Sequence, residues 1–443
     1  MTTPIYDFVK GYKKSGKSRF HMPGHKGRGP FASSDITEID GADVLYHADG
    51  IIAESEANAT VLFNTGHTFY STEGSTLAIK AMLGIIAREC GRGAKILATR
   101  NVHKAFVYAI GETDLAVEWL YPEEGGHLCE CKITAESVRR ALEAAETKPS
   151  AVYITSPDYL GNLLDVGGIA GVCKEFGIPL LVDNAHGAYL AFSNPNLHPI
   201  QLGAAMCADS AHKTLPVLTG GAYLHIAKGY EKYAEMARDT LSLFASTSPS
   251  YLTLASLDLC NRTLATSFGA GLSKCKQKVT EIKSLLTLLG QTENSREDTK
   301  IRIDAHRFGY TGVGYSEILS KNRVECEYAD DRYVVLMASP FNRARDYKRL
   351  SRVIKKIKEE GRAPICINEP RLTHLPTAEL SVREALFAPY ETVDVKDACG
   401  RICASPTVSC PPAIPVAVSG EIIDTETVKI LCYYGIKKVN VVK

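Results

Sequence analysis

The sequence has no long hydrophobic run and no excess of either charge. A transmembrane helix needs about 18 or more consecutive apolar residues, and no stretch approaches that length. The 51 basic and 50 acidic side chains give a formal net charge of +1, which removes the electrostatic case for nucleic acid or an anionic membrane as the main partner. Residues 1–17 lack the apolar centre of a signal peptide, so we expect a cytoplasmic protein.

The cysteines show no pattern typical of a metal site or a disulfide framework. There are 13, scattered along 443 residues, and an odd, irregular set of this kind is typical of reduced thiols. Cys129 and Cys131 form a C-x-C pair, but no second Cys/His pair lies at zinc-finger spacing. We therefore expect no bound metal.

The first half of the chain has the pattern of an α/β domain. Short apolar strands alternate with amphipathic helices between about residues 63 and 225, which predicts a mostly parallel sheet with helices on both faces. The expected strands are 94–99, 116–121, 151–155, 179–182 and 204–208. The expected helices are 77–88, one starting at His103, 134–145 and 167–176. Ligands bind such sheets at the carboxyl ends of the strands.

The second half of the chain has a different pattern of predicted elements. A long helical region spans 251–291 and ends in a polar break at 292–299. A smaller α/β unit follows from Ile301, with a basic amphipathic helix over 343–360. After a proline-rich segment, 363–415, the sequence predicts a last helix with Asp424 as N-cap that stops at Gly435, and then a strand over 438–442.

Two ionisable residues fall just after predicted strands. Asp183 follows the buried strand 179–182, and an acid there is costly to bury without a cation or a hydrogen-bond donor; a protonated pyridine nitrogen would serve, and so would a structural turn. Lys213 follows the strand 204–208. Its amine is suited to bind a carbonyl cofactor covalently if it is partly desolvated, although most lysines are solvated surface charges.

Two further features fit a phosphorylated, ring-containing ligand. Gly74, Ser75 and Thr76 open a helix, and the free N–H groups and dipole of a helix N-terminus favour an anion such as phosphate; plain capping is the alternative function. His103 is placed to stack on an aromatic ring, or else is a structural histidine. A phosphate site, a stacking ring, an acid and a lysine in this chain order predict a pyridoxal-phosphate (PLP) site.

Several longer motifs carry a resemblance to a known family. They are HMPGHK at 21–26, RNVHK at 100–104, VDNAHGA at 182–188, SAHKTLP at 210–216, STSPSY at 246–251, PPAIP at 411–415 and GE at 420–421. The chain resembles the bacterial ornithine/lysine/arginine decarboxylases of PLP fold type I, in the short form without an N-terminal wing domain. The resemblance implies an α/β large domain like that of aspartate aminotransferase, with a mostly parallel, seven-stranded type of sheet.

The resemblance also implies a division of the chain. It comprises an N-terminal arm (1–45), a PLP-binding large domain (46–291), a small α/β domain (292–362) and a C-terminal lobe (363–443). By the same resemblance the protein is a homodimer with shared active sites, or a higher oligomer of such dimers. Thr247 would then reach the phosphate in the neighbouring subunit.

The resemblance assigns roles to individual residues. Lys213 would hold PLP covalently, Asp183 would pair with the pyridine nitrogen, His103 would stack on the ring and His186 would lie beside the cofactor. The expected phosphate and lysine surroundings are Gly74, Ser75, Thr76, Ser210, His212 and Thr247. Glu327 matches a family acid that binds the distal amine of the substrate, and Glu421 is a second candidate for substrate binding.

The motifs depart from the family pattern at several positions near the expected pocket. The departures are Glu73 for Asn, Ala211 for Thr, Gly220-Gly221-Ala222 for Gln-Ala-Ser, Ala413 for Gly and Ser419 for Pro. The reaction implied is decarboxylation of lysine, ornithine or arginine, among which the sequence does not choose. Another fold type I reaction (an aminotransferase or an aldol-type lyase) and a PLP-binding paralogue without activity remain the alternatives.

Overall fold

The computed structural model describes residues 1–122, 126–366, 376–408 and 413–443. Within these ranges the largest sheet consists of β1 (His67–Ser71), β2 (Lys95–Thr99), β3 (Ala116–Leu120), β4 (Ala151–Thr155), β5 (Leu180–Asp183), β6 (Met206–Asp209) and β7 (Ala222–Ile226). The strand order is β1-β7-β6-β5-β4-β2-β3. Strands β2 to β6 pair in parallel, whereas β7 is antiparallel to both β1 and β6. The mostly parallel, seven-stranded α/β sheet that we expected is therefore confirmed.

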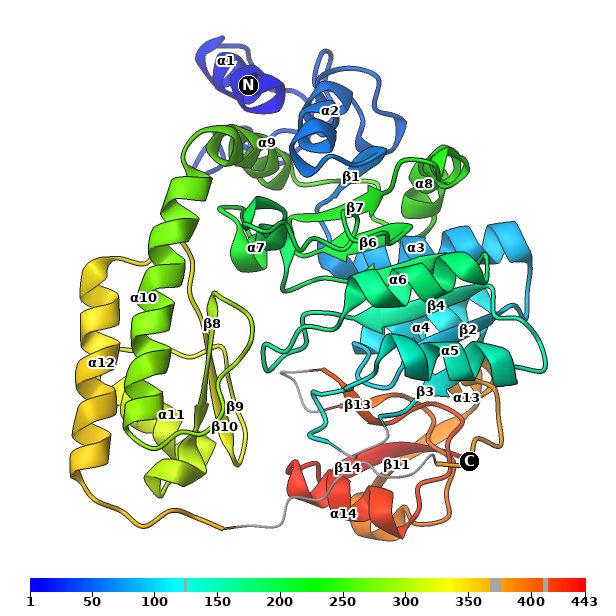
Figure 1. Cartoon of the computed structure of the whole chain (residues 1–443). Coiled ribbons are helices and arrows are strands. Elements are labelled where there is room, and N and C mark those ends of the chain that lie inside the picture. The colour runs from blue at the N-terminus through cyan, green and yellow to red at the C-terminus, as the bar shows by residue number, and fades with distance from the viewer. Residues whose placement is uncertain (123–125, 367–375, 409–412) are drawn as a thin grey trace.

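Helices cover both faces of this sheet (Figure 1). They include α3 (Gly74–Cys90), α4 (Lys104–Thr113), α5 (Ala135–Ala144), α6 (Val166–Glu175) and α8 (Glu231–Phe244). In β4, Tyr153 belongs to the core beneath α3 and α4, while Val152 and Ile154 belong to the core beneath α5 and α6. This alternation follows from the period of two in a strand, and burial on both faces explains the nearly continuous apolar composition.

The predicted elements of the first half match these bounds to within a few residues. The five expected strands correspond to β2 to β6. Helix α5, expected over 134–145, begins with a capping box between Thr134 and Ser137. Strands β1 and β7 were not predicted. They form an antiparallel pair at one end of the sheet, outside the strand–helix alternation on which the prediction depended.

The long helical region after residue 251 is two helices rather than one. These are α9 (Tyr251–Thr266) and α10 (Phe268–Leu288), which meet at Ser267, where the backbone leaves helical geometry. The side chains of α10 divide between two cores. Phe268 and Leu272 pack in the core of the seven-stranded sheet, whereas Val279 and Leu286 pack in a second core. Helix α10 therefore physically connects the two cores.

The second core surrounds a smaller antiparallel sheet. Among the described residues it contains β8 (Lys300–Asp304), β10 (Tyr333–Met337) and β9 (Tyr328–Ala329), in that order. Helices α10, α11 (Gly312–Lys321) and α12 (Ala344–Glu359) contribute to this core, and α12 is the basic amphipathic helix that the sequence predicted. In Figure 1 this unit lies beside the large sheet, with α10 and α12 on its outer side.

The C-terminal residues form a third group of elements, beside the edge of the large sheet that β3 forms (Figure 1). They are α13 (Val382–Phe387), β11 (Tyr390–Asp394), β12 (Thr407–Val408), β13 (Pro415–Ala417), α14 (Thr425–Tyr433) and β14 (Lys438–Val442). Asp424 caps α14 by accepting a hydrogen bond from the N–H of Thr427, as predicted. Part of the proline-rich segment (367–375) and of the PPAIP motif (411–412) lies outside the described residues.

Three further helices, α1 (Pro4–Lys14), α2 (Ile51–Phe63) and α7 (Ala211–Thr214), belong to the unit that contains the large sheet. Near the N-terminus, α1 and α2 pack against each other and against α9. The short helix α7 follows β6 directly. In the ranges described above, no helix is both long enough and apolar enough to cross a membrane. The expected domain boundaries stay predictions.

Candidate active site

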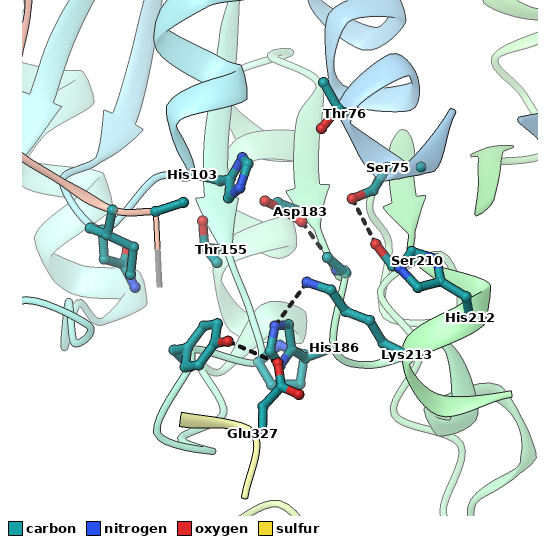
Figure 2. A pocket seen from close by; sticks show the side chains of 17 residues that line it. Ser75, Thr76, His103, Thr155, Asp183, His186, Ser210, His212, Lys213 and Glu327 are labelled. Carbon is teal, nitrogen blue, oxygen red and sulfur yellow. Dashed lines mark hydrogen bonds between the residues drawn. The ribbon is translucent and has the colours of Figure 1, made fainter. Parts of the chain in front are cut away.

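A cavity of about 280 Å³ opens at the carboxyl ends of β4, β5 and β6, the location that a parallel sheet of this kind favours for ligands. Most of the residues that the sequence singled out line it together (Figure 2). These are Gly74, Ser75, Thr76, His103, Asp183, His186, Ser210, His212, Lys213 and Glu327. Thr247 and Glu421 are not part of its described lining.

Lys213 lies on the short helix α7 and points its amine into the cavity (Figure 2). Its Nζ is 3.0 Å from Nε2 of His186. Burial lowers the pKa of Lys213, against the opposing attraction of Asp183 and Glu327. A lysine amine with a lowered pKa is more often neutral, and only the neutral amine has the lone pair that attacks a carbonyl carbon.

Asp183 is the last residue of β5 and only 3% exposed. One carboxylate oxygen accepts a hydrogen bond from the backbone N–H of Ala185 at 3.0 Å. Burial raises the pKa of Asp183 to about 6, although the charge of Lys213 opposes the shift. A carboxylate in this position lacks enough compensation for its lost hydration, so it favours a ligand that brings a positive charge.

His103 caps helix α4 from the wall of the cavity. Its Nδ1 accepts a hydrogen bond from the backbone N–H of Ala105 at 3.1 Å, so the helix begins one residue later than the sequence predicted. Burial lowers the pKa of His103 to about 4, and the charges of Lys213 and Lys104 add to this shift. The ring is therefore neutral near pH 7, as a flat stacking surface should be, and its orientation is fixed by the cap.

The N-terminus of α3 forms a cradle with two hydroxyl groups. The Ser210 hydroxyl donates to the Ser75 hydroxyl at 2.7 Å, and Thr76 lies on the same first turn. Gly74 has a φ of 72°, a value that glycine adopts without strain. The long, buried helix α3 directs its positive dipole end toward this point, which suits a phosphate group.

The two consecutive glycines that depart from the family pattern support this cradle. The carbonyl of Gly220 accepts the N–H of Gly74 at 2.7 Å, and that of Gly221 accepts Nδ1–H of His212 at 3.0 Å. Gly220 has a φ of 94°, and a Cβ there would lie 2.7 Å from the carbonyl oxygen of Thr72. Glycine is thus required by the backbone at this position.

Ala413 departs from the family pattern in the opposite direction, because an alanine stands where the pattern has glycine. It lines the cavity with a φ of 59°, in the left-handed region where glycine is favoured and a side chain is strained. Its carbonyl nevertheless accepts the N–H of Lys104 at 2.9 Å. The alanine therefore makes this backbone contact with a local strain that glycine would avoid.

Glu327 reaches the cavity from the smaller sheet, immediately before β9. The hydroxyl of Tyr159 donates to its carboxylate at 2.9 Å, which fixes the acid at the same side of the cavity as His186 (Figure 2). Tyr159 was not among the site residues expected from the sequence. The signal was available, because Tyr159 lies four residues past the end of β4 and strand ends were expected to carry the site.

Thr247 lies on the exposed segment between α8 and α9. Its neighbour Ser246 donates its backbone N–H to the carboxylate of Glu73 at 2.8 Å. The segment is thereby held beside the first turn of α3. Whether Thr247 serves a second subunit stays a prediction.

Glu421 is buried in an ion pair with Arg100, at 3.0 Å between Oε2 and Nη2. Its carboxylate also accepts the N–H of Val418 at 2.7 Å, and Arg100 donates to the carbonyls of Pro415 and Val416. Burial raises the pKa of Glu421, while the charge of Arg100 opposes the shift. Through these contacts Glu421 attaches the C-terminal lobe to the end of β2. The substrate role that the resemblance suggested for Glu421 stays a prediction.

Replacing Arg100 with methionine should therefore destabilise the protein strongly. The change leaves the buried Glu421 carboxylate unpaired, which costs about 3–5 kcal/mol, so we expect the apparent melting temperature to fall by roughly 5–10 °C. Differential scanning calorimetry checks this. The matched control is Arg139→Met, which removes a solvent-exposed pair with Glu175 and should change the melting temperature little. Equal shifts in the two variants would contradict the prediction.

The cavity contains groups that suit PLP. The carboxylate of Asp183 and the hydroxyl of Thr155 face it, and neither Thr155 Oγ1 nor the nearby Asn101 Oδ1 has a hydrogen-bond partner among the described residues. The Asp183 carboxylate, which favours a cation, suits the ring nitrogen of that cofactor. The helix cradle suits its phosphate, and the lysine amine suits its aldehyde. The residues present thus fit the group.

Comparisons with known proteins identify the family. Residues 3–308 match the family model for the Orn/Lys/Arg decarboxylase major domain, and residues 370–439 match that for the C-terminal domain. An arginine decarboxylase of Bacillus subtilis is 30% identical, covering 96% of this chain and 92% of its own length. One of Halalkalibacterium halodurans is also 30% identical, covering 95% and 91%.

Solved structures support the fold. The lysine decarboxylase LdcF of Francisella novicida superposes with a TM-score of 0.80 over 100% of this chain and 81% of that one, at 17% identity. At that identity the likeness establishes the fold alone, whereas the family models span most of the sequence. The chain belongs to the Orn/Lys/Arg decarboxylase family.

Proposed function

We propose that this protein is a PLP-dependent carboxy-lyase that decarboxylates a basic amino acid, namely arginine, lysine or ornithine. The observation that carries the proposal is one cavity in which Lys213, Asp183 and the distal acid Glu327 converge. Relatives of nearly the same length are named arginine decarboxylases, which makes arginine the first substrate to test.

Each side chain of the cavity has a distinct task in this proposal. Lys213 would bind the aldehyde carbon of PLP, Asp183 its ring nitrogen, and Ser75 and Ser210 its phosphate together with the α3 N-terminus. When bound, the cofactor supplies an electron sink for the pair of electrons left behind by departing CO2. Asp183 would keep the ring nitrogen of the bound cofactor protonated, and His103 would support the ring, so that the cavity can orient the substrate's Cα–carboxylate bond for cleavage.

A proton must be returned to Cα after CO2 leaves. Lys213 and His186 are the two candidate donors, because both line the cavity and their nitrogens are 3.0 Å apart. A positioned side chain of this kind contributes about 10²–10⁴-fold to such a proton transfer. The product is the corresponding amine.

Glu327 would select the positive distal group of the substrate. Replacing it with glutamine preserves the shape and removes the charge, so we expect KM for the preferred amino acid to rise about 10- to 150-fold, as the loss of a charge-assisted hydrogen bond of 1.5–3 kcal/mol predicts. Steady-state CO2 release measures the effect. Tyr159→Phe, which removes the hydroxyl that donates to Glu327, is the matched control and should raise KM less. An unchanged KM in Glu327→Gln would refute the assignment.

The reaction itself is tested by offering arginine, lysine, ornithine and several unrelated amino acids separately to the PLP-loaded protein. Release of CO2 from one basic amino acid establishes both reaction and substrate. Keto-acid formation would instead identify an aminotransferase, and aldehyde release from a β-hydroxy amino acid an aldol-type lyase. Cofactor binding without turnover of any substrate would identify an inactive paralogue.

We also propose that the protein acts as a homodimer in the cytoplasm. The segment after α1 exposes three large apolar side chains, Phe20 at 94%, Met22 at 67% and Phe31 at 83%. Exposed apolar groups gathered on one segment are typical of a surface that a partner covers. In such a dimer Thr247 would complete the phosphate site of the neighbouring subunit.

A further inference from the structure

A second lysine, Lys300, lies behind the cavity and is fully buried. It is the first residue of β8, and its Nζ has three described neighbours: Glu297 Oε2 at 3.1 Å, the Asp158 carbonyl oxygen at 3.1 Å and His186 Nδ1 at 3.0 Å. His186 in turn is 3.0 Å from the amine of Lys213 through its other nitrogen. One imidazole therefore connects two lysine amines.

The neighbours of Lys300 define the direction of its hydrogen bonds. A buried ammonium requires a compensating charge, and the equally buried Glu297 supplies one. An ammonium group has three N–H donors and no acceptor. The Asp158 carbonyl accepts one of these protons at 3.1 Å, and Glu297 lies beside the group as an ion-pair partner. Because an ammonium can only donate, its 3.0 Å contact with Nδ1 of His186 requires that nitrogen to present its lone pair.

The state of His186 then determines the state of Lys213. Burial lowers the pKa of His186 well below its ordinary value, and the charges of Lys213 and Lys300 add to the shift, so the ring is neutral. A neutral imidazole has one donor and one acceptor. With Nδ1 as the acceptor, the proton lies on Nε2 and is donated to Lys213, whose amine accepts it only in the neutral form.

We propose that Lys300, held by Glu297, is a positioning residue that fixes the tautomer of His186 and thereby keeps the cofactor-free Lys213 as a neutral, nucleophilic amine. The inference rests on the proposed function only in that the neutral Lys213 amine is the group that would bind the cofactor. It assigns a role in the site to the smaller sheet beyond that of Glu327, because Lys300 belongs to β8.

Other charged groups also face these residues, and the test must separate them from Lys300. Asp183 and Glu327 act on Lys213, while His103 and His212 act on His186. Changing Lys300 leaves all four in place. Lys283 offers a matched control, since its Nζ donates to the carbonyls of Ser295 and Glu297 at 2.8 and 2.6 Å. It therefore stabilises the same segment without being a hydrogen-bond partner of His186.

The experiment uses full-length, cofactor-free protein labelled with ¹⁵N-histidine. Long-range ¹⁵N–¹H spectra distinguish a protonated from an unprotonated ring nitrogen, and loss of one signal set in His186→Gln assigns the residue. In the unmodified protein we expect Nε2 protonated and Nδ1 unprotonated. In the double variant Lys300→Met/Glu297→Gln, which avoids a buried unpaired carboxylate, this preference should be lost. Lys283→Met should retain it.

A second measurement follows the amine of Lys213. Its rate of acetylation by acetic anhydride, read by mass spectrometry of the Lys213 peptide, should be roughly five- to tenfold lower near pH 7 in the double variant than in Lys283→Met, as loss of one hydrogen bond predicts. A protonated Nδ1 in the unmodified protein overturns the proposal, whether or not any variant folds. Unchanged tautomer and acetylation rate in a folded double variant also overturn it. Neither readout involves substrate, so failure of the decarboxylase assay leaves both results interpretable.

Discussion

Replacing Lys213 with alanine should abolish decarboxylation and remove the visible absorbance that PLP acquires on binding covalently to the protein. Lys213 is the lysine amine that lines the cavity beside Asp183. Without it the protein loses both its attachment to the cofactor and a donor for the returning proton, so we expect activity to fall by at least about 10³-fold. Absorbance spectra and CO2 release measure the two losses separately.

The control for this experiment is Lys174→Ala. Lys174 is an exposed lysine in the last turn of α6, and its removal should affect neither absorbance nor activity. A Lys213→Ala protein that keeps the absorbance of the unmodified protein would show that another lysine holds the cofactor. The assignment of the whole cavity would then fail.

Replacing Asp183 with asparagine should weaken cofactor binding by about 10²–10⁴-fold. The substitution leaves the protonated ring nitrogen without its buried counter-charge, and breaking a buried pair costs about 3–5 kcal/mol. Equilibrium titration with PLP measures the affinity. Activity at saturating cofactor should fall as well, because an unprotonated ring is a poorer electron sink.

The same variant should have the opposite effect on the stability of the cofactor-free protein. Because burial raises the pKa of Asp183 from 3.8 to about 6, its contribution to stability is fully present below pH 3.8 and is lost as the pH rises through 6. Above that pH, asparagine avoids the cost of a buried carboxylate. We expect a gain of up to roughly 3 kcal/mol at pH 8 and little at pH 4, measured by urea unfolding. Equal changes at both pH values would contradict this account.

Most of the residues that line the cavity were predictable from the sequence because they follow a simple rule. Asp183, Lys213 and His103 each stand just beyond a predicted strand, and parallel strands bring those ends together. Tyr159 obeys the same rule and could have been found. Lys300 could not, because it comes from the start of a different sheet, and no local pattern indicates that β8 packs against the loop carrying His186.

The two acids suggested for substrate binding illustrate another limit. Glu421 was the weaker of the two candidates in the sequence; in the structure it is paired with Arg100, whereas Glu327 opens into the cavity. Both acids are far along the chain from the strand ends that form the cavity. Only tertiary packing therefore determines which of them reaches it. The break between α9 and α10 was not predicted, because the residue at the break is Ser267 rather than a glycine or a proline.

The smaller sheet has a consequence for any attempt to redesign the enzyme. The backbone of Glu327 is bonded to Val335 of β10, and Val335 is paired with Arg302 of β8, two residues from Lys300. The acid proposed to recognise the substrate and the lysine proposed to prepare the nucleophile are thus carried on a single hydrogen-bonded ladder. A loop graft before β9 that accommodates a longer or shorter amino acid would also displace Lys300, so engineers should expect altered preference and slower turnover to arise together unless β8 is rebuilt as well.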